Sequence, residues 1–207
     1  MTGPVRGRRG ALRGGFALVT ATVAALIPAL GSAQASPHAS GAVPTPTQTP
    51  TPLPPELVTS LPGAALRGSA AMRFLGLALY DLRLWSPGPL VGDGAAQPLA
   101  LELVYARNLV GARIAGRSLD EMRGIGTVSE TQAASWLAAM TALFPDVVAG
   151  DRLTGLQQPG KSAQFFFNGQ RRGEVADADF TRLFFGIWLS PRSSEPKLRA
   201  QLLGLKG

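Results

Sequence analysis

The alternation of apolar and polar positions predicts most of the secondary structure of the chain. In residues 69–85, Tyr80, Leu82 and Leu84 alternate with polar neighbours, which is the period of a β-strand. We interpret the whole segment as one strand. Its first part is apolar at successive positions and is therefore expected to be covered on both faces. Residues 99–107 alternate in the same way and predict the next strand.

Two segments then follow a helical period. Apolar residues recur along one face of residues 110–125 and again along one face of residues 129–144. Ser129 and Gln132 have the spacing of a capping box at the start of the second helix. Pro145 is expected to end that helix, because proline cannot continue it.

The last third of the chain predicts further strands and two more helices. Three segments have strand character: residues 151–158, 162–167 and 170–175. Asn168-Gly169 is a hairpin turn signal, Asp177 is an expected helix N-cap, and Pro196 and Gly204 mark the two ends of a last helix. Because strands and helices occur in separate runs, we predict an α+β fold with an antiparallel sheet and helices on one face.

The first 35 residues have the pattern of a cleavable secretory signal. Arginines without an acidic residue precede an apolar run, residues 16–30, which is shorter than the ~20 residues of a membrane span. We expect cleavage after Ala35, no stable membrane span afterwards, and a periplasmic or secreted protein. An uncleaved anchor is the alternative. The Arg8-Arg9 pair leaves both the general secretory and the twin-arginine route open.

Three regions are expected along the chain: a signal peptide at 1–35, a disordered linker rich in proline and threonine at 36–55, and one domain at 56–207. Removal of the four signal arginines lowers the formal net charge from +7 to +3. Since no basic cluster remains, we expect no nucleic-acid partner.

The composition also limits the chemistry of the domain. The chain has no cysteine, and its one histidine, His38, lies in the linker. The domain is therefore expected to lack thiolate and multi-histidine metal sites and histidine-based catalytic triads. Without a nucleotide-binding glycine motif either, the sequence predicts no cofactor.

Two polar residues within the apolar first strand are the candidate binding residues. Arg73 and Tyr80 are seven positions apart, so in an unbroken strand they face opposite sides. A β-bulge near Gly76 would bring them onto one face. An arginine beside an apolar cleft can hold a carboxylate or an enolate through two hydrogen bonds. The alternative is an arginine at the sheet margin that pairs with an acidic residue.

Four stretches together resemble the chalcone isomerase-like family. Residues 68–85 resemble its long Gly-x-Gly-Leu-Arg…Tyr strand segment, and residues 114–126, 144–155 and 165–189 follow in the family's order and spacing. The resemblance is closest to exported bacterial members. It implies an open-faced β-sandwich, a large antiparallel sheet with a layer of helices and a cleft between them. In the plant enzymes that cleft cyclises chalcones. In related plastid proteins it binds fatty acids, whose carboxylate meets an arginine and a tyrosine.

The resemblance also implies candidate positions. The family arginine corresponds to Arg73 if the motif sets the register, or to Arg67 if the distance to Tyr80 does. The enzymes' helical tyrosine and asparagine fall on Ile114 and Glu121. Their C-terminal serine or threonine falls on one of two adjacent serines, Ser193 or Ser194.

Three functions follow from these positions. Since the helical tyrosine–asparagine pair is replaced, we expect a non-catalytic binder of a small apolar acid such as a fatty acid. An isomerase that acts on an enone of chalcone type and an envelope interaction module without a ligand are the alternatives. The sequence leaves the identity of the ligand and the oligomeric state open.

Overall fold

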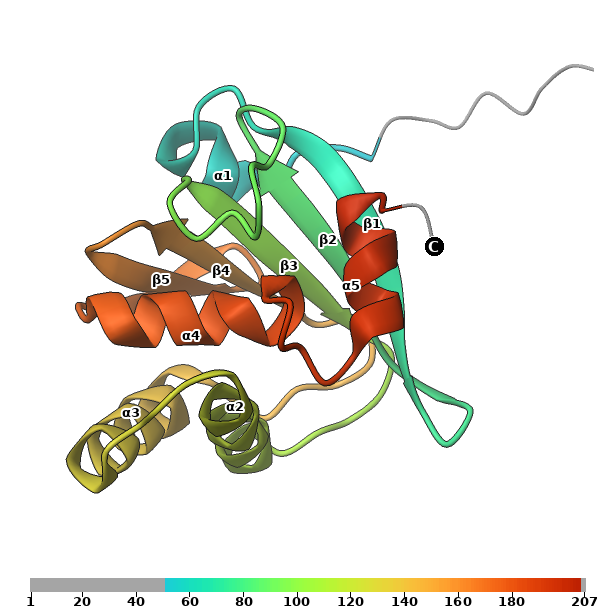
Figure 1. The fold of residues 1–207 in the computed structure, drawn as a ribbon. Helices are drawn as coiled ribbons and strands as arrows, with labels where there is room; N and C mark the ends of the chain where they lie inside the picture. Colours follow the sequence, from blue (N-terminus) through green and yellow to red (C-terminus); the bar gives the residue numbers. More distant parts are fainter. Residues whose placement is uncertain (1–50, 206–207) are drawn as a thin grey trace, which may run out of the picture. The chain divides into compact units, whose positions relative to one another are not determined.

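A computed structural model describes residues 51–205 of the chain. The expected signal peptide and residues 36–50 of the expected linker lie outside these residues. The strands form a six-stranded antiparallel sheet in chain order (Figure 1). They are β1 (Ala65–Phe74), β2 (Leu77–Ser86), β3 (Leu99–Tyr105), β4 (Arg152–Gln158), β5 (Ser162–Phe167) and β6 (Gln170–Val175). The helices are α1 (Pro55–Ser60), α2 (Gly111–Ile125), α3 (Glu130–Leu143), α4 (Ala178–Leu189) and α5 (Pro196–Leu203).

The helices are distributed unequally over the two faces of the sheet. Helix α4 packs on β4 and β5, and α5 packs along β1 and β2, while α2 packs against α4 and α3 (Figure 1). The predicted α+β architecture with a helix layer on an antiparallel sheet is confirmed. No helix within the described residues is long and apolar enough to cross a bilayer.

The first helix was not predicted, and it covers the opposite face of the sheet. There Leu57 of α1 and Leu61, which follows the helix, pack against Trp85, Leu156 and Phe166. Two buried carboxylates lie on the same face. The expected layer of helices covers one face, and α1 adds a short helix on the other face at this end of the domain.

The buried carboxylates of Glu56 and Glu102 are satisfied by neighbouring side chains. Glu56 accepts hydrogen bonds from Arg152 at 2.9 Å and from Thr154 at 2.8 Å, and Glu102 accepts one from the Trp85 indole at 3.0 Å. A buried carboxylate is tolerated only with such partners. Since Glu56 belongs to α1, its bonds to β4 fix that helix on the sheet.

The segment predicted as one strand, residues 69–85, is a hairpin. Leu75 (φ 49°) and Gly76 (φ 79°) form a two-residue turn between β1 and β2, and the pair of positive φ angles is that of a type I′ turn. Leucine rarely adopts a positive φ, so the sequence carries no ordinary turn signal here. The bulge expected near Gly76 is also misplaced. The pairing register shifts at Leu79, which has no partner on β1.

Other local predictions are confirmed. Ser129 and Gln132 form both hydrogen bonds of the capping box at α3. Asp177 accepts hydrogen bonds from two backbone amides at the start of α4. Gly204 ends α5 in the left-handed conformation with φ 62°. Each of these residues is a type that favours its position for a local reason, independent of the tertiary fold.

Helix α5 approaches β1 so closely that Gly68 has no room for a side chain. A Cβ atom there would lie 1.9 Å from the carbonyl oxygen of Leu202. We expect Gly68→Ala to push α5 off the strand and to lower the free energy of unfolding by about 1–3 kcal/mol, measured by urea denaturation. Gly88→Ala is the control, because a Cβ at Gly88 meets nothing within 4 Å. Equal stability of the two variants would contradict the close packing.

Candidate ligand-binding cavity

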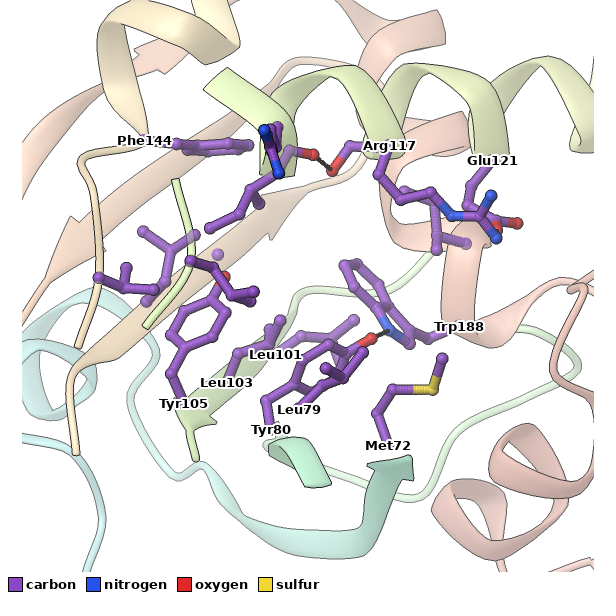
Figure 2. Close-up of a pocket in the computed structure, with 18 of the residues that line it drawn as sticks. Met72, Leu79, Tyr80, Leu101, Leu103, Tyr105, Arg117, Glu121, Phe144 and Trp188 are labelled. Atoms are coloured by element: carbon purple, nitrogen blue, oxygen red, sulfur yellow. Dashed lines mark hydrogen bonds and ion pairs between the residues drawn. The ribbon is translucent and has the colours of Figure 1, made fainter. Parts of the chain in front are cut away.

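A cavity of about 820 Å³ lies between the sheet and α2. Its size is within the ~300–1,000 Å³ typical of small-molecule sites. The sheet side is mostly apolar, and Figure 2 shows its residues pointing towards α2. Among these residues are Met72, Leu79, Tyr80, Leu101, Leu103 and Tyr105. The helix side is more polar, so the cavity has an apolar floor and a charged rim.

Helix α2 is held at both ends by side chains from other segments. The backbone amide of Gly111, its first residue, donates to a carboxylate oxygen of Asp146 at 2.8 Å. At the other end, Arg192 donates to the carbonyl oxygen of Ile125 at 2.9 Å. Arginine at a C-terminal carbonyl satisfies a group that the helix leaves free. The helix is therefore fixed without resting directly on the sheet.

Two tyrosines form the polar part of the cavity floor. Tyr80 of β2 and Tyr105 of β3 are partners in the strand register, and their ring centroids lie 6.0 Å apart, edge to face. The Trp188 indole donates to the Tyr80 oxygen at 3.0 Å (Figure 2), which leaves the Tyr80 O–H free to donate. The Tyr105 hydroxyl is buried and has no hydrogen-bond partner among residues 51–205.

Burial keeps both hydroxyls protonated. It raises the pKa of Tyr80 from 10.0 to about 12 and also raises the pKa of Tyr105. The Trp188 hydrogen bond opposes part of the increase at Tyr80, while the charge of Glu195 adds to it. Both tyrosines are therefore neutral hydrogen-bond donors at physiological pH.

The charged residues of the rim differ in how far they are already paired. Arg117 forms an ion pair with Glu121 one helical turn later, and Asp146 is bonded to the start of α2. Arg113 lines the cavity, is exposed, and forms no ion pair or side-chain hydrogen bond with any residue from 51 to 205. Arg113 is therefore the cation of the cavity wall that an anionic ligand can reach without breaking an existing pair.

Four of the residues proposed from the sequence line this cavity. They are Tyr80, Ile114, Glu121 and Ser194. The cavity thus brings together side chains from β2, from α2 and from the segment before α5. The helical positions that the family resemblance implied for Ile114 and Glu121 do face the sheet.

The other three proposed residues lie elsewhere. Arg73 is exposed and lies between Met72 and Phe74, which both line the cavity, so strand alternation turns it to the other face. Arg67 donates to the carbonyl oxygens of the Ser86–Pro87 segment. Ser193 is buried and donates to the Ile187 carbonyl oxygen at 2.7 Å. The side chains of Arg67 and Ser193 are therefore engaged in hydrogen bonds to the backbone that stabilise the fold.

The sequence reasoning passed over Tyr105, Arg113 and Arg117. Arg117 is three residues after Ile114 and four before Glu121, which is the spacing of one helix face. This spacing could have identified Arg117 as a residue on the same helix face as the two proposed residues. Tyr105 ends the apolar face of the predicted second strand, as the one hydroxyl after Leu101 and Leu103. No cluster of metal-ligating side chains is found within residues 51–205.

The raised pKa values predict how the domain responds to alkaline pH. The chain has only two tyrosines, and both lie in the cavity. In the unfolded chain they ionise near pH ~10, whereas the folded domain keeps both protons. The contribution of the tyrosines to stability is therefore constant below that pH and is lost as the pH rises from about 10 towards 12.

A titration of tyrosinate absorbance, followed together with circular dichroism, tests this expectation. The native domain should show no tyrosinate near pH 10, and both should appear as it unfolds. The chain in urea, which should titrate near pH ~10, is the control. Tyrosinate formed near pH 10 without loss of structure would show that a hydroxyl is solvated.

Comparisons with known proteins agree with this architecture. A protein of Haemophilus influenzae described as uncharacterized is 33% identical over 108 residues, which cover 52% of each chain. The chain therefore matches about half the length of that curated relative. An Arabidopsis thaliana fatty-acid binding protein has a similar structure, with a TM-score of 0.54, 11% identity, and coverage of 69% of this chain and 87% of its own. Residues 57–204 match the chalcone isomerase-like family, and the chain belongs to that family.

Proposed function

We propose that the domain binds a small apolar acid, such as a fatty acid, and is not a catalyst. The observation that carries the proposal is the combination of an apolar cavity with an unpaired cation at its rim, Arg113. In this binding mode the carboxylate meets Arg113, and the hydrocarbon chain lies on the leucine-rich floor. Fatty-acid binding by the Arabidopsis protein of similar fold supports the same class of ligand.

The state of the two rim arginines selects Arg113 over Arg117. An arginine can bind a carboxylate through two parallel hydrogen bonds, and the interaction strengthens beside an apolar surface. Arg117 already contacts Glu121, so a ligand carboxylate there would compete with a protein carboxylate. Arg113 has no such competitor among residues 51–205.

The tyrosines supply hydrogen bonds without adding charge. Tyr80 has a free O–H because its oxygen already accepts from Trp188, and Tyr105 has no partner in the described domain. Both can donate to an oxygen of the ligand. Neutral donors suit an apolar cavity, since a buried charge without a partner would destabilise the fold.

Binding of palmitate to delipidated protein tests the proposal. We expect Arg113→Ala to weaken binding by roughly tenfold or more, because a hydrogen bond to a charged group contributes ~1.5–3 kcal/mol. Tyr105→Phe should weaken it less and should not lower the unfolding free energy, since no bond within the described domain is lost. Isothermal titration calorimetry gives the affinities.

Two controls make the result specific to the site. Arg107→Ala removes an exposed arginine that does not line the cavity and should leave affinity unchanged. Palmitate methyl ester lacks the charge and should not depend on Arg113. The proposal fails if palmitate does not bind or if Arg113→Ala binds it equally. Conversion of a chalcone that Arg113→Ala abolishes would assign an isomerase instead.

We also propose that the protein is exported, and this rests on the sequence of residues 1–35 alone. Expression of the full chain in a bacterial host, followed by fractionation and N-terminal sequencing, tests it. The expected product is a periplasmic or secreted chain that begins at Ser36. An intact N-terminus in the membrane fraction would favour an anchor, and one in the cytoplasm would contradict export.

A further inference from the structure

The turn between β1 and β2 exposes large apolar side chains. Phe74 is 61% exposed, Leu75 is 86% exposed and Leu77 is 55% exposed. In Figure 1 this hairpin extends past the end of α5, at the lower right of the domain. Water-exposed apolar residues are ordinary when scattered singly, but here three of them lie within four positions. We call residues 74–77 the apolar tip.

The apolar tip adjoins the mouth of the cavity. Phe74 belongs to the tip and also lines the cavity. Met72 and Leu79, just outside the tip on either side of the turn, line the cavity too. Val110 and Val148 are also exposed, at 47% and 54%, and they line the cavity as well. A ligand that enters the cavity between these residues therefore passes from the exposed apolar tip to the apolar lining of the cavity.

The backbone at the tip is unfavourable for the residue that occupies it. Leu75 has a φ of 49°, a conformation that favours glycine or asparagine over leucine. Leu75, the most exposed apolar side chain of the turn, therefore lies at its apex. Neither packing within the domain nor the geometry of the turn favours a leucine at this position. A contact outside the domain would explain it.

The charged side chain nearest to the turn is basic. Arg73 is the only charged residue between Gly68 and Tyr80, and it is exposed. Asp81 pairs with Ala71 farther from the turn, and the cavity rim carries both signs: Arg113 and Arg117 with Glu121, Asp146 and Glu195. An apolar protrusion beside an arginine fits the surface of an anionic lipid bilayer, where the apolar groups enter the interface and Arg73 meets the headgroups.

We propose that the apolar tip docks the domain on an anionic lipid bilayer, so that the mouth of the cavity faces the lipid. The four residues of the tip present less surface than the roughly 800 Å² per partner of a standard protein interface. The docking goes beyond the proposed function and does not require it. Its consequence for that function is that an apolar acid can pass between bilayer and cavity with less exposure to water.

Co-sedimentation with vesicles tests the docking. The chain that begins at Ser36 is used, because both hydrophobic clusters lie within residues 53–203 and this chain contains them whole. The vesicles are phosphatidylcholine alone or an equal mixture with phosphatidylglycerol. We expect the wild type to bind the anionic vesicles. The double variant Leu75→Asn/Leu77→Ser should lower the partition coefficient by roughly tenfold or more.

The variants are chosen so that folding and ligand binding are preserved. Asparagine accepts the positive φ of position 75, and neither Leu75 nor Leu77 lines the cavity. The matched control, Val58→Ser/Val91→Ser, removes two exposed apolar side chains, 59% and 79% exposed, away from the tip. It should bind as the wild type does. Arg73→Ala should weaken binding about fivefold on anionic vesicles and leave neutral vesicles unaffected.

Each outcome supports or overturns the docking. No binding to anionic vesicles, or equal binding by the tip variant, overturns it. A dimer in analytical ultracentrifugation that the tip variant dissolves would assign the tip to self-association and also overturn it. Palmitate titration in solution, without vesicles, tests the proposed function independently of the docking. Loss of palmitate binding with intact vesicle binding would reject the proposed function alone, and the reverse result would reject the docking alone.

Discussion

The cavity depends on one constraint, which is that α2 does not rest on the sheet. The aromatic side chains of α4, among them Phe184 and Trp188, fill the space against β5 and support α2 from the side. Asp146 and Arg192 bind the two ends of α2 and prevent it from settling inward. Cores normally close such gaps, because unfilled space costs free energy. The fixed ends of α2 therefore maintain an interior that a ligand can occupy.

Burial also varies systematically along the first hairpin. At its inner end Leu82 and Leu84 are fully covered, and Gly68 lets α5 approach β1. Towards the turn the helix layer ends, and the same apolar pattern continues to Leu77 and Leu75 in solvent. On the other face, α1 covers the part of the sheet around Trp85, Leu156 and Phe166. The exposed tip is therefore where both covering layers stop.

Local rules predicted the elements whose signals lie in a few adjacent residues. Asn168-Gly169 and Leu75-Gly76 make the same kind of turn, with positive φ at both positions. The first was predicted because asparagine favours that conformation, and the second was not, because leucine disfavours it. Helix α1 was missed since its six residues are held by long-range contacts, above all from Glu56, and not by a helical repeat of their own.

The candidate site likewise combines features that adjacent residues predict with features that only the tertiary fold determines. The family resemblance indicated Ile114 and Glu121, seven positions apart on α2, and both line the cavity. The side to which Arg73 points depended on the turn at Leu75 and on the register shift at Leu79, both of which are tertiary facts. Selecting Arg113 over Arg117 required knowledge of which arginine is already paired, and only the folded structure supplies it.

Tyr105 gives the strongest argument that this interior is a site and not a packing defect. A buried hydroxyl without a partner costs about 1–3 kcal/mol, and phenylalanine would bury the same ring without that cost. Its neighbour Tyr80 differs, because the Trp188 indole satisfies its oxygen. Folding therefore explains the hydroxyl of Tyr80 in part and does not explain that of Tyr105. An oxygen atom of a bound molecule would remove the cost, so the free energy lost on folding would be recovered on binding.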